Sequence, residues 1–234
     1  MRLMNCPVCN SIMFSSWLKV VTGGEYSLCE CGCAFLNPRM DEAELKEYYT
    51  SGAYRTNTEQ IDEGSKVAKE QHQERADYLV NILGRAGFES HLDIGCSSGY
   101  LLKAVEKKNP DIFSMGVDID PVLHSSDFLV VESLEEVDRD FELITMMHTL
   151  EHINDPVKMI RMIYDRLEPG GLFVVEVPNR RASMVAFVPP HHVVAYDDKS
   201  LDYLLKDFKP VDTIFHGNIH KSPLDLNILK MVTK

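Results

Sequence analysis

The sequence predicts an α/β protein with a doubly wound, parallel sheet and a small cysteine-rich unit in front of it. From residue 91 onward, short apolar segments alternate with amphipathic ones, which is typical of strands connected by helices. The segment 172–177 is apolar almost throughout, as expected of a strand buried on both faces. Five of the six cysteines lie within the first 33 residues. A chain of 234 residues is long enough for one such sheet and one small unit.

Residues 1–38 are predicted to form a ribbon that binds zinc. Cys6 and Cys9 form a CxxC pair, and a second group of cysteines follows about twenty residues later, behind a hairpin predicted within 14–28. Two cysteine groups at this spacing are typical of zinc ribbons, in which four thiolates surround one ion. A segment of this size has too small a hydrophobic core to fold without such a crosslink.

The second cysteine group is irregular, because Cys29, Cys31 and Cys33 alternate with other residues. We assign Cys6, Cys9, Cys29 and Cys31 as the zinc ligands, since a glycine follows Cys31, as is common in such groups. Cys33 is the alternative fourth ligand. The competing interpretation is a ribbon that has lost its metal.

Residues 39–75 are predicted to be a mostly helical linker or lid. Asp41 is a suitable N-cap for a helix over 42–49. The polar stretch 50–64 has few large apolar side chains. A second helix is predicted over 65–83, where apolar residues recur near helical spacing.

Residues 76–234 are predicted to form the sheet and the helices that cover it. The predicted strands are 91–94, 113–119, 128–131, 143–147 and 172–177, followed by terminal strands at 210–216 and 226–232. The predicted helices are 100–107, 156–167 and 199–206. A Pro-Gly-Gly sequence at 169–171 is expected to separate the second of these helices from the strand that follows.

A nucleoside-type cofactor is predicted at the carboxyl ends of the first two strands, where doubly wound sheets bind their ligands. Gly95 and Gly99 lie in the turn between the first strand and its helix, and glycine lets the backbone approach a ligand closely. Asp118 ends the second strand, and its carboxylate can accept hydrogen bonds from both hydroxyls of a ribose. Neither feature is specific alone, but together they fit nucleoside binding.

Five segments resemble the motifs of class I S-adenosylmethionine-dependent methyltransferases in sequence and order. They are DIGCSSG (93–99), GVDIDP (116–121), FELI (141–144), HTLEH (148–152) and LEPGG (167–171). The combination of LEH with a following DP resembles the branch that methylates small molecules. The cysteine-rich front, followed by AFLNPR and an acidic helix, resembles the zinc-ribbon methyltransferases related to sugar C-methyltransferases. The resemblance implies a Rossmann-like methyltransferase sheet.

The resemblance also implies which residues bind S-adenosylmethionine. Asp93 and the turn 95–99 would hold its methionine part, Asp118 its ribose, and the end of the fourth strand would face the sulfonium and the methyl acceptor. The predicted set is Asp93, Gly95, Cys96, Ser97, Gly99, Asp118, Ile119, Ser133, Leu134, Met146, Met147 and His148. Ser97 departs from the pattern, because the family often has glycine there.

Three histidines are candidates for the base that deprotonates the methyl acceptor, because the pKa of histidine lies near neutrality. His192 follows the fifth strand and resembles the histidine of the family's histidine-tyrosine loop, so it is assigned first. His148 and His152 complete the set, although histidine in the LEH element often stabilises its loop instead. A divalent-metal site is the alternative, with ligands drawn from His148, Glu151, His152 and either His191 or His192.

The composition restricts the partners. The net charge of -12 argues against nucleic acid as the main partner, since phosphate contacts require a basic surface. No apolar stretch has the length of a membrane helix, and no secretory signal is visible at the N-terminus. We therefore expect a cytoplasmic protein whose partner is a small-molecule methyl acceptor, such as a sugar or a natural-product intermediate.

Three other functions compete with this one. A dinucleotide-dependent oxidoreductase shares the layout of strand, glycine turn, helix and acid, but serine at 97 and tyrosine at 100 interrupt a GxGxxG motif. A non-catalytic interaction protein would keep the ribbon and a vestigial cofactor fold without turnover. An RNA methyltransferase with a zinc domain is opposed by the acidic balance.

Overall fold

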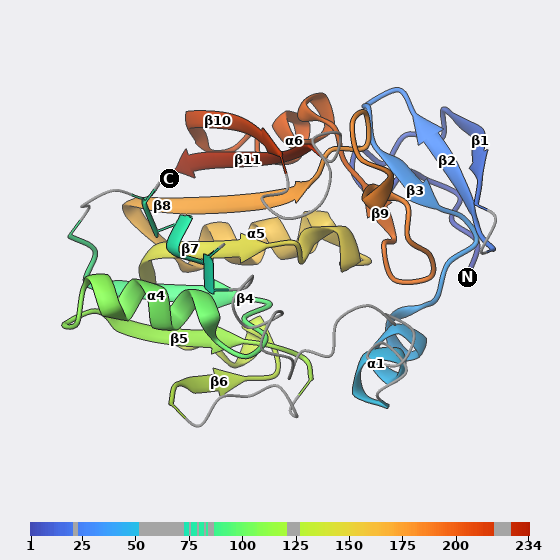
Figure 1. Ribbon diagram of the computed structural model, residues 1–234. Helices are drawn as coiled ribbons and strands as arrows, with labels where there is room; N and C mark the ends of the chain where they lie inside the picture. Colours follow the sequence, from blue (N-terminus) through green and yellow to red (C-terminus); the bar gives the residue numbers. More distant parts are fainter. Residues whose placement is uncertain are drawn as a thin grey trace.

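The computed structural model of the chain describes residues 1–20, 23–51, most of 73–83, 87–120, 127–217 and 226–234. Within these residues the backbone forms a seven-stranded sheet and a four-stranded sheet (Figure 1). The larger sheet carries the carboxyl terminus, and the smaller one lies beside the amino terminus. Among the described residues, no helix combines the length and apolar composition needed to cross a membrane.

The larger sheet has the strand order β10-β11-β8-β7-β4-β5-β6. Its strands are β4 (Ser90–Ile94), β5 (Phe113–Val117), β6 (Leu129–Val131), β7 (Phe141–Met147), β8 (Leu167–Pro178), β10 (Lys209–Gly217) and β11 (Leu226–Thr233). The first five are parallel, and β11 pairs antiparallel with both β8 and β10. The predicted doubly wound sheet is confirmed, and it is mixed because of its two terminal strands. The strand order reverses at β4, which lies between β5 and β7, so ligands are expected at the carboxyl ends of these strands.

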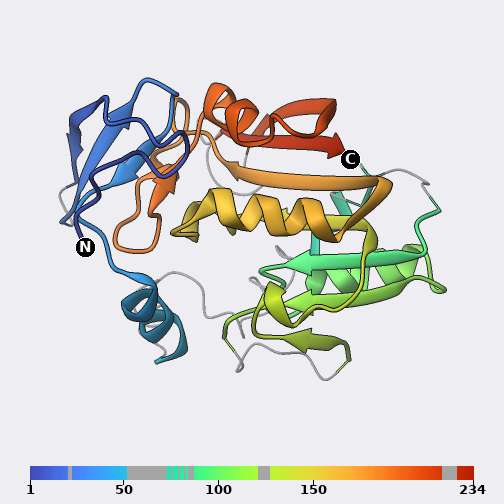
Figure 2. The same ribbon diagram turned by 180° about the vertical axis from the view of Figure 1, so that it is seen from behind.

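Helices cover both faces of this sheet. In Figure 1, α4 (Tyr100–Lys108) lies in front of the strands, and in the opposite view of Figure 2 α5 (Pro156–Arg166) does. A third helix, α6 (Asp198–Leu204), precedes the terminal strands. Short 3-10 turns occur at η2 (Leu134–Glu136), η3 (Leu150–His152) and η4 (Met184–Ala186).

The linker helix begins where the sequence predicts. The helix α1 (Glu42–Thr50) starts after Asp41, whose side chain accepts a hydrogen bond from the Glu44 amide, while the Glu44 side chain accepts one from the Asp41 amide. Of the second predicted helix, the described residues between 73 and 83 are helical. Its beginning, and the polar stretch before it from 52 onward, lie outside the described residues.

The strand β8 begins earlier than predicted. It starts at Leu167, whereas the Pro-Gly-Gly sequence at 169–171 was expected to delay it. Pairing with β7 shifts register, since Phe141 faces Leu167 but Leu143 faces Leu172. The residues between Leu167 and Leu172 therefore form an irregularity within the strand, where Gly170 has a φ of 80°, and the strand continues through them.

The smaller sheet has the order β1-β2-β3-β9. Three of its strands belong to the cysteine-rich unit, namely β1 (Phe14–Lys19), β2 (Glu25–Cys29) and β3 (Ala34–Leu36). The fourth, β9 (Val194–Ala195), comes from the segment that follows β8. One hydrophobic cluster joins the unit to the larger domain, because Phe35 packs in the same cluster as Val194. The cysteine-rich unit is therefore built against the larger domain and shares its core.

Candidate active site

A cavity of about 660 Å³ opens at the carboxyl ends of β4, β5 and β7. All of the predicted cofactor residues line it except Gly99 and Met146. Met146 is fully buried in the core, because successive side chains of a strand point to opposite faces, and only its neighbour Met147 reaches the cavity. Gly99 caps the start of α4. The predicted residues are thus brought to one place from four separate segments.

The turn after β4 needs glycine for steric reasons. Gly95 has a φ of 77°, and a Cβ atom there would collide with the side chain of Thr149. Gly99 also adopts a positive φ, of 74°. Ser97 lies in the left-handed region as well, with a φ of 47°, where glycine would be unstrained. The turn therefore brings bare backbone to the cavity wall, which is the feature that a closely held cofactor requires.

Backbone hydrogen bonds orient the Asp118 carboxylate at the cavity wall. Its Oδ2 accepts from the Ser97 amide at 2.8 Å, and its Oδ1 accepts from the Asp120 amide at 2.9 Å. A carboxylate offers about four lone-pair sites, so this group fits the two hydroxyls of a ribose. The Ser97 contact links the end of β5 to the turn after β4.

Asp93 lies beneath the turn and is 4% exposed. The Thr145 hydroxyl donates to its Oδ1 at 2.7 Å, and His91 Nε2 lies 2.8 Å from the same hydroxyl. Burial raises the pKa of Asp93 to about 7, against the opposing effect of the Thr145 hydrogen bond. Thr145 and His91 were not predicted as site residues, since both lie inside strands and become neighbours of Asp93 only when the strands pair.

His148 lies between two carboxylates at the edge of the cavity. It follows β7 with a φ of 50°, its Nε2 is 2.8 Å from Glu176 Oε1, and its Nδ1 is 3.4 Å from Glu151 Oε1. Glu176 is fully buried and also accepts from Asn227 Nδ2 at 3.1 Å. Glu176 was not predicted as a site residue, although a glutamate inside the otherwise apolar segment 172–177 is a usable signal.

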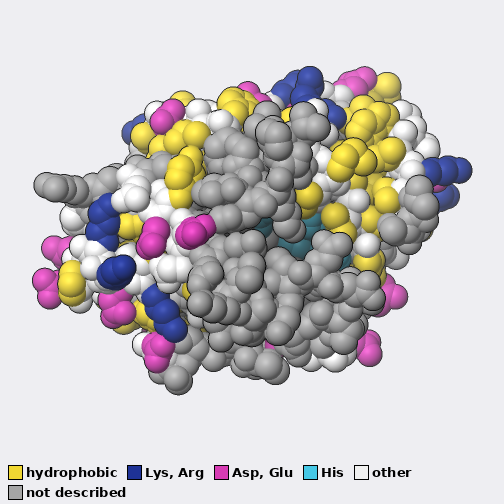
Figure 3. All heavy atoms as spheres, in the orientation of Figure 1, with side chains coloured by type: hydrophobic (Ala, Val, Ile, Leu, Met, Phe, Trp, Pro, Cys, Tyr) yellow, Lys and Arg dark blue, Asp and Glu magenta, His cyan; other side chains and the backbone are white. Residues whose placement is uncertain are grey.

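Three more histidines, His152, His191 and His192, lie together beside Glu151. The space-filling view shows histidine side chains in a hollow of the surface (Figure 3). The His152 and His192 rings are 4.7 Å apart, and those of His191 and His192 are 4.9 Å apart. His152 Nδ1 lies 3.1 Å from the His191 carbonyl and 2.8 Å from the Tyr49 hydroxyl. Of the three predicted catalytic histidines, His148 and His152 line the cavity and His192 does not.

Burial and neighbouring side chains shift the pKa values of the groups in this cluster. Burial would raise the pKa of Glu151, but His148 and the neighbouring histidines lower it to about 2, so the group is ionised. Burial lowers the pKa of His191 to about 4 and that of His192 well below its ordinary value.

Glu151, His152 and His192 each offer a ligand atom within 4.8 Å of the others. Within the described part of the chain, the closest polar contact of Glu151 is that of its Oε1 with His148 Nδ1 at 3.4 Å, and its Oε2 has no hydrogen-bond partner. These three residues fit the divalent-metal alternative, which stays a prediction.

One wall of the cavity is formed by residues outside the predicted set. Leu45 and Tyr49 of α1, and Met159 and Met162 of α5, line it together with the predicted residues. Their helices were predicted, but nothing local in the sequence shows that α1 lies across the carboxyl end of the sheet. The buried Arg39, which precedes α1, ties this part of the chain to the larger domain, because its guanidinium donates to the Asn154 carbonyl at 2.6 Å.

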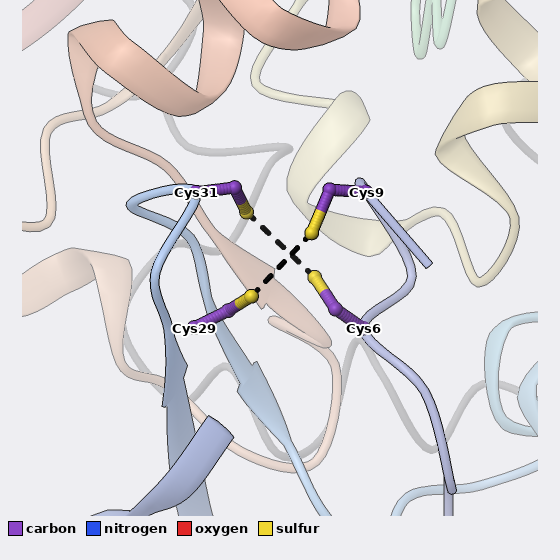
Figure 4. Close-up of side chains that lie close together, drawn as sticks. All are labelled: Cys6, Cys9, Cys29 and Cys31. Atoms are coloured by element: carbon purple, nitrogen blue, oxygen red, sulfur yellow. Dashed lines mark hydrogen bonds between the residues drawn. The ribbon is translucent and has the colours of Figure 1, made fainter. Parts of the chain in front are cut away.

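The predicted metal ligands lie together at a second site, in the cysteine-rich unit (Figure 4). The sulfur atoms of Cys6, Cys9, Cys29 and Cys31 all lie within 4.8 Å of one another. Cys6 and Cys31 are 3.7 Å apart, and Cys9 and Cys29 are 3.5 Å apart. Ligands of a tetrahedral zinc are separated by roughly 3.8 Å, as a bond length of ~2.3 Å requires, so the group fits the ion. Cys33 is not a member of this group, although its sulfur lies 3.3 Å from that of Cys6.

Comparison with known proteins identifies the family. Residues 62–210 match the family described as methyltransferase domain. Ubiquinone biosynthesis O-methyltransferases are similar: that of Sodalis glossinidius (strain morsitans) is 24% identical over 165 residues, and that of Shewanella halifaxensis (strain HAW-EB4) is 27% identical over 162. These alignments cover 64% and 63% of this chain, and 66% and 64% of the relatives. The chain thus spans slightly less than two thirds of their length.

A solved structure shows the same fold. Magnesium protoporphyrin IX methyltransferase from Synechocystis PCC 6803, with bound S-adenosylhomocysteine, has a TM-score of 0.59 at 13% identity, covering 83% of this chain and 100% of that chain. The fold is therefore that of the S-adenosylmethionine-dependent methyltransferases. The chain belongs to the methyltransferase-domain family.

Proposed function

We propose that the protein transfers a methyl group from S-adenosylmethionine to a small molecule. The observation that carries this proposal is one cavity that is lined by the glycine turn and Asp118 together with His148 and His152. When bound there, the cofactor supplies an electrophilic methyl group, and the chain aligns it with the acceptor. The relatives are described as O-methyltransferases of ubiquinone biosynthesis, which supports a small acceptor. The net charge of -12 is also consistent with that class.

The finer assignment of the acceptor rests on the resemblance alone. The cysteine-rich front resembles methyltransferases related to sugar C-methyltransferases, so we propose a sugar or a natural-product intermediate as the acceptor class. Incubation with S-adenosylmethionine and candidate acceptors, followed by measurement of released S-adenosylhomocysteine, tests both levels of the proposal. Thermal stabilisation by NAD but not by S-adenosylhomocysteine would instead support the oxidoreductase. Cofactor binding without turnover on any acceptor would support a non-catalytic interaction protein.

Replacement of Asp118 by alanine is expected to weaken S-adenosylhomocysteine binding by about 1.5–3 kcal/mol, the range for hydrogen bonds to a charged group. The carboxylate lies at the cavity wall, where a ribose can donate to it. Calorimetric titration measures the affinity. Asp111→Ala is the matched control, because Asp111 is exposed and lies outside the cavity lining. An Asp118→Ala affinity equal to that of the control would remove Asp118 from the site.

Cofactor affinity is expected to rise with pH around neutrality. Burial raises the pKa of Asp93 to about 7, so the group is mainly protonated at pH 6 and mainly ionised at pH 8. Only the ionised form pairs with the ammonium of the cofactor's methionine part, so affinity at pH 6 should be about tenfold lower than at pH 8. Asp93→Asn should abolish this difference in calorimetric titrations. A pH dependence that persists in Asp93→Asn would assign it to another group.

We propose that His152 takes the proton of the acceptor. In the tautomer with the proton on Nδ1, that nitrogen donates to the His191 carbonyl at 3.1 Å, and Nε2 is the nitrogen that receives a proton. His152 lines the cavity, whereas His192 lies behind it. Glu151 Oε1, 4.0 Å from His152 Nε2, would stabilise the protonated imidazole, and the His192 ring packs edge to face against it. His148 shapes the cavity edge between its two carboxylates.

We further propose that Cys6, Cys9, Cys29 and Cys31 bind one structural zinc ion. The support is the geometry of the four sulfur atoms, which lie within 4.8 Å of one another and match a tetrahedral site. Cys33 is close enough to influence the site but is not assigned as a ligand.

A further inference from the structure

One of the segments that join the cysteine-rich unit to the larger domain is residues 187–195, which also carries two of the clustered histidines. The segment pairs with β3 at Ala34↔Ala195 and Phe35↔Val194, which places β9 in the smaller sheet. The Leu36 amide also donates to the Val193 carbonyl at 2.9 Å. The unit therefore contacts the stretch that carries His191 and His192.

Tyr26 forms the most direct link. Its side chain is fully buried in β2, and its hydroxyl donates to the His192 carbonyl at 2.6 Å. The Tyr26 ring packs edge to face against Phe187, with 5.2 Å between ring centroids, so one side chain holds both the start and the middle of the segment. Burial raises the pKa of the Tyr26 hydroxyl above its ordinary value, which keeps it protonated as a donor.

The opposite side of the segment contacts the proposed catalytic cluster. The Val193 amide donates to the Glu151 carbonyl at 2.8 Å, and the His191 carbonyl accepts from His152 Nδ1 at 3.1 Å. Residues 191–193 are thus held between Tyr26 on one side and the η3 turn on the other. A shift of the segment would move the carbonyl that fixes the orientation of the His152 ring.

We propose that Tyr26 is a positioning residue of the methyl-transfer site: it fixes the segment 191–193, and through it the rings of His152 and His192. The cysteine-rich unit is then a structural part of the acceptor side, and it does not serve as a separate binding module. Tyr26 does not line the cavity, so it acts through the segment that it holds. The proposal deepens the proposed function and rests on it for its catalytic meaning.

The test compares Tyr26→Phe, which removes the hydroxyl but keeps the ring packing, with Tyr203→Phe. Tyr203 is 41% exposed on α6 and contacts neither the segment nor the cavity, so it is the matched control. Hydrogen exchange of the 187–196 peptide should become about fivefold faster in Tyr26→Phe, the factor that one typical buried hydrogen bond provides. The cofactor turn at 93–102 should keep its exchange rate.

Ring nitrogen spectra of the histidines supply a second readout. In Tyr26→Phe the signals of His152 and His192 should shift, while the signal of His91, buried in the larger sheet, should not. Unchanged exchange and unchanged histidine signals would overturn the proposal, and so would equal shifts of all three rings, which would indicate a general loosening. Calorimetric titration with S-adenosylhomocysteine tests the proposed function separately from the role of Tyr26. If the wild-type protein fails to bind S-adenosylhomocysteine, the proposed function is contradicted. The exchange rates and the histidine signals then still decide whether Tyr26 positions the segment.

Discussion

Protein purified without added metal is expected to contain one zinc ion per chain, and replacement of Cys6 by serine is expected to remove it and unfold the cysteine-rich unit. Cys6 is one of four sulfur ligands that lie within 4.8 Å of one another. Structural zinc contributes an apparent ~10–16 kcal/mol in small zinc-binding peptides. That is comparable to the whole stability of a domain, about 5–15 kcal/mol, so the short strands β1 to β3 should not persist without it.

Elemental analysis measures the zinc, and thermal unfolding measures its effect. Cys96→Ser is the matched control, because Cys96 is buried in the cofactor turn and is remote in function from the ribbon. Cys31→Ser and Cys33→Ser decide the fourth ligand: the assignment requires that the first loses zinc and the second retains it. A zinc-free protein whose melting temperature is unaffected by Cys6→Ser would show instead that the ribbon has lost its metal.

Loss of zinc should also reach beyond the unit itself. The strand β9 pairs with β3, and Cys33 packs in the same hydrophobic cluster as Val194. Unfolding of the unit would therefore expose one edge of the segment that holds the histidines. The cofactor turn follows β4, which pairs with β5 and β7 and not with β9, so we expect the turn to keep its geometry.

Features set by local patterns could be predicted from the sequence. The N-cap at Asp41 was predicted from its residue type before the helix, and it forms as expected; the structure adds the reciprocal hydrogen bond of the Glu44 side chain. The positive φ angles of Gly95 and Gly99 follow from the placement of glycine between a strand and a helix. The alternation of strands and helices likewise predicted the layered sheet, because each burial pattern is a property of its own segment.

Features that depend on distant pairing could not be predicted in this way. The contact of Tyr26 with His192 spans 166 residues, and no local signal indicates it. The same holds for Tyr49 against His152, which depends on where α1 lies relative to the sheet. Met146 illustrates a different cause: the side-chain alternation of a strand predicts that only one of two neighbours reaches a cavity, but the choice depends on which face is open.

Replacement of His152 by alanine is expected to lower turnover by roughly 10²–10⁴-fold, the usual contribution of a positioned general base, while cofactor affinity stays near that of wild type. His152 lines the cavity, and its Nδ1 is fixed by the His191 carbonyl, so its loss removes the proton acceptor without disturbing the glycine turn. His192→Ala should reduce turnover less, because His192 lies behind His152. His148→Ala should have an intermediate effect, since that ring forms the cavity edge between Glu176 and Glu151.

These comparisons use released S-adenosylhomocysteine as the rate measurement once an acceptor has been identified, with calorimetric titration as the control for cofactor binding. Arg166→Ala serves as the matched surface variant, because Arg166 ends α5 outside the cavity lining. If His192→Ala loses the most turnover, the assignment returns to the histidine that the resemblance favoured. If added Mg²⁺ or Mn²⁺ is required for wild-type turnover, and both His152→Ala and His192→Ala abolish that requirement, the cluster with Glu151 holds a metal ion and His152 is its ligand instead of a base.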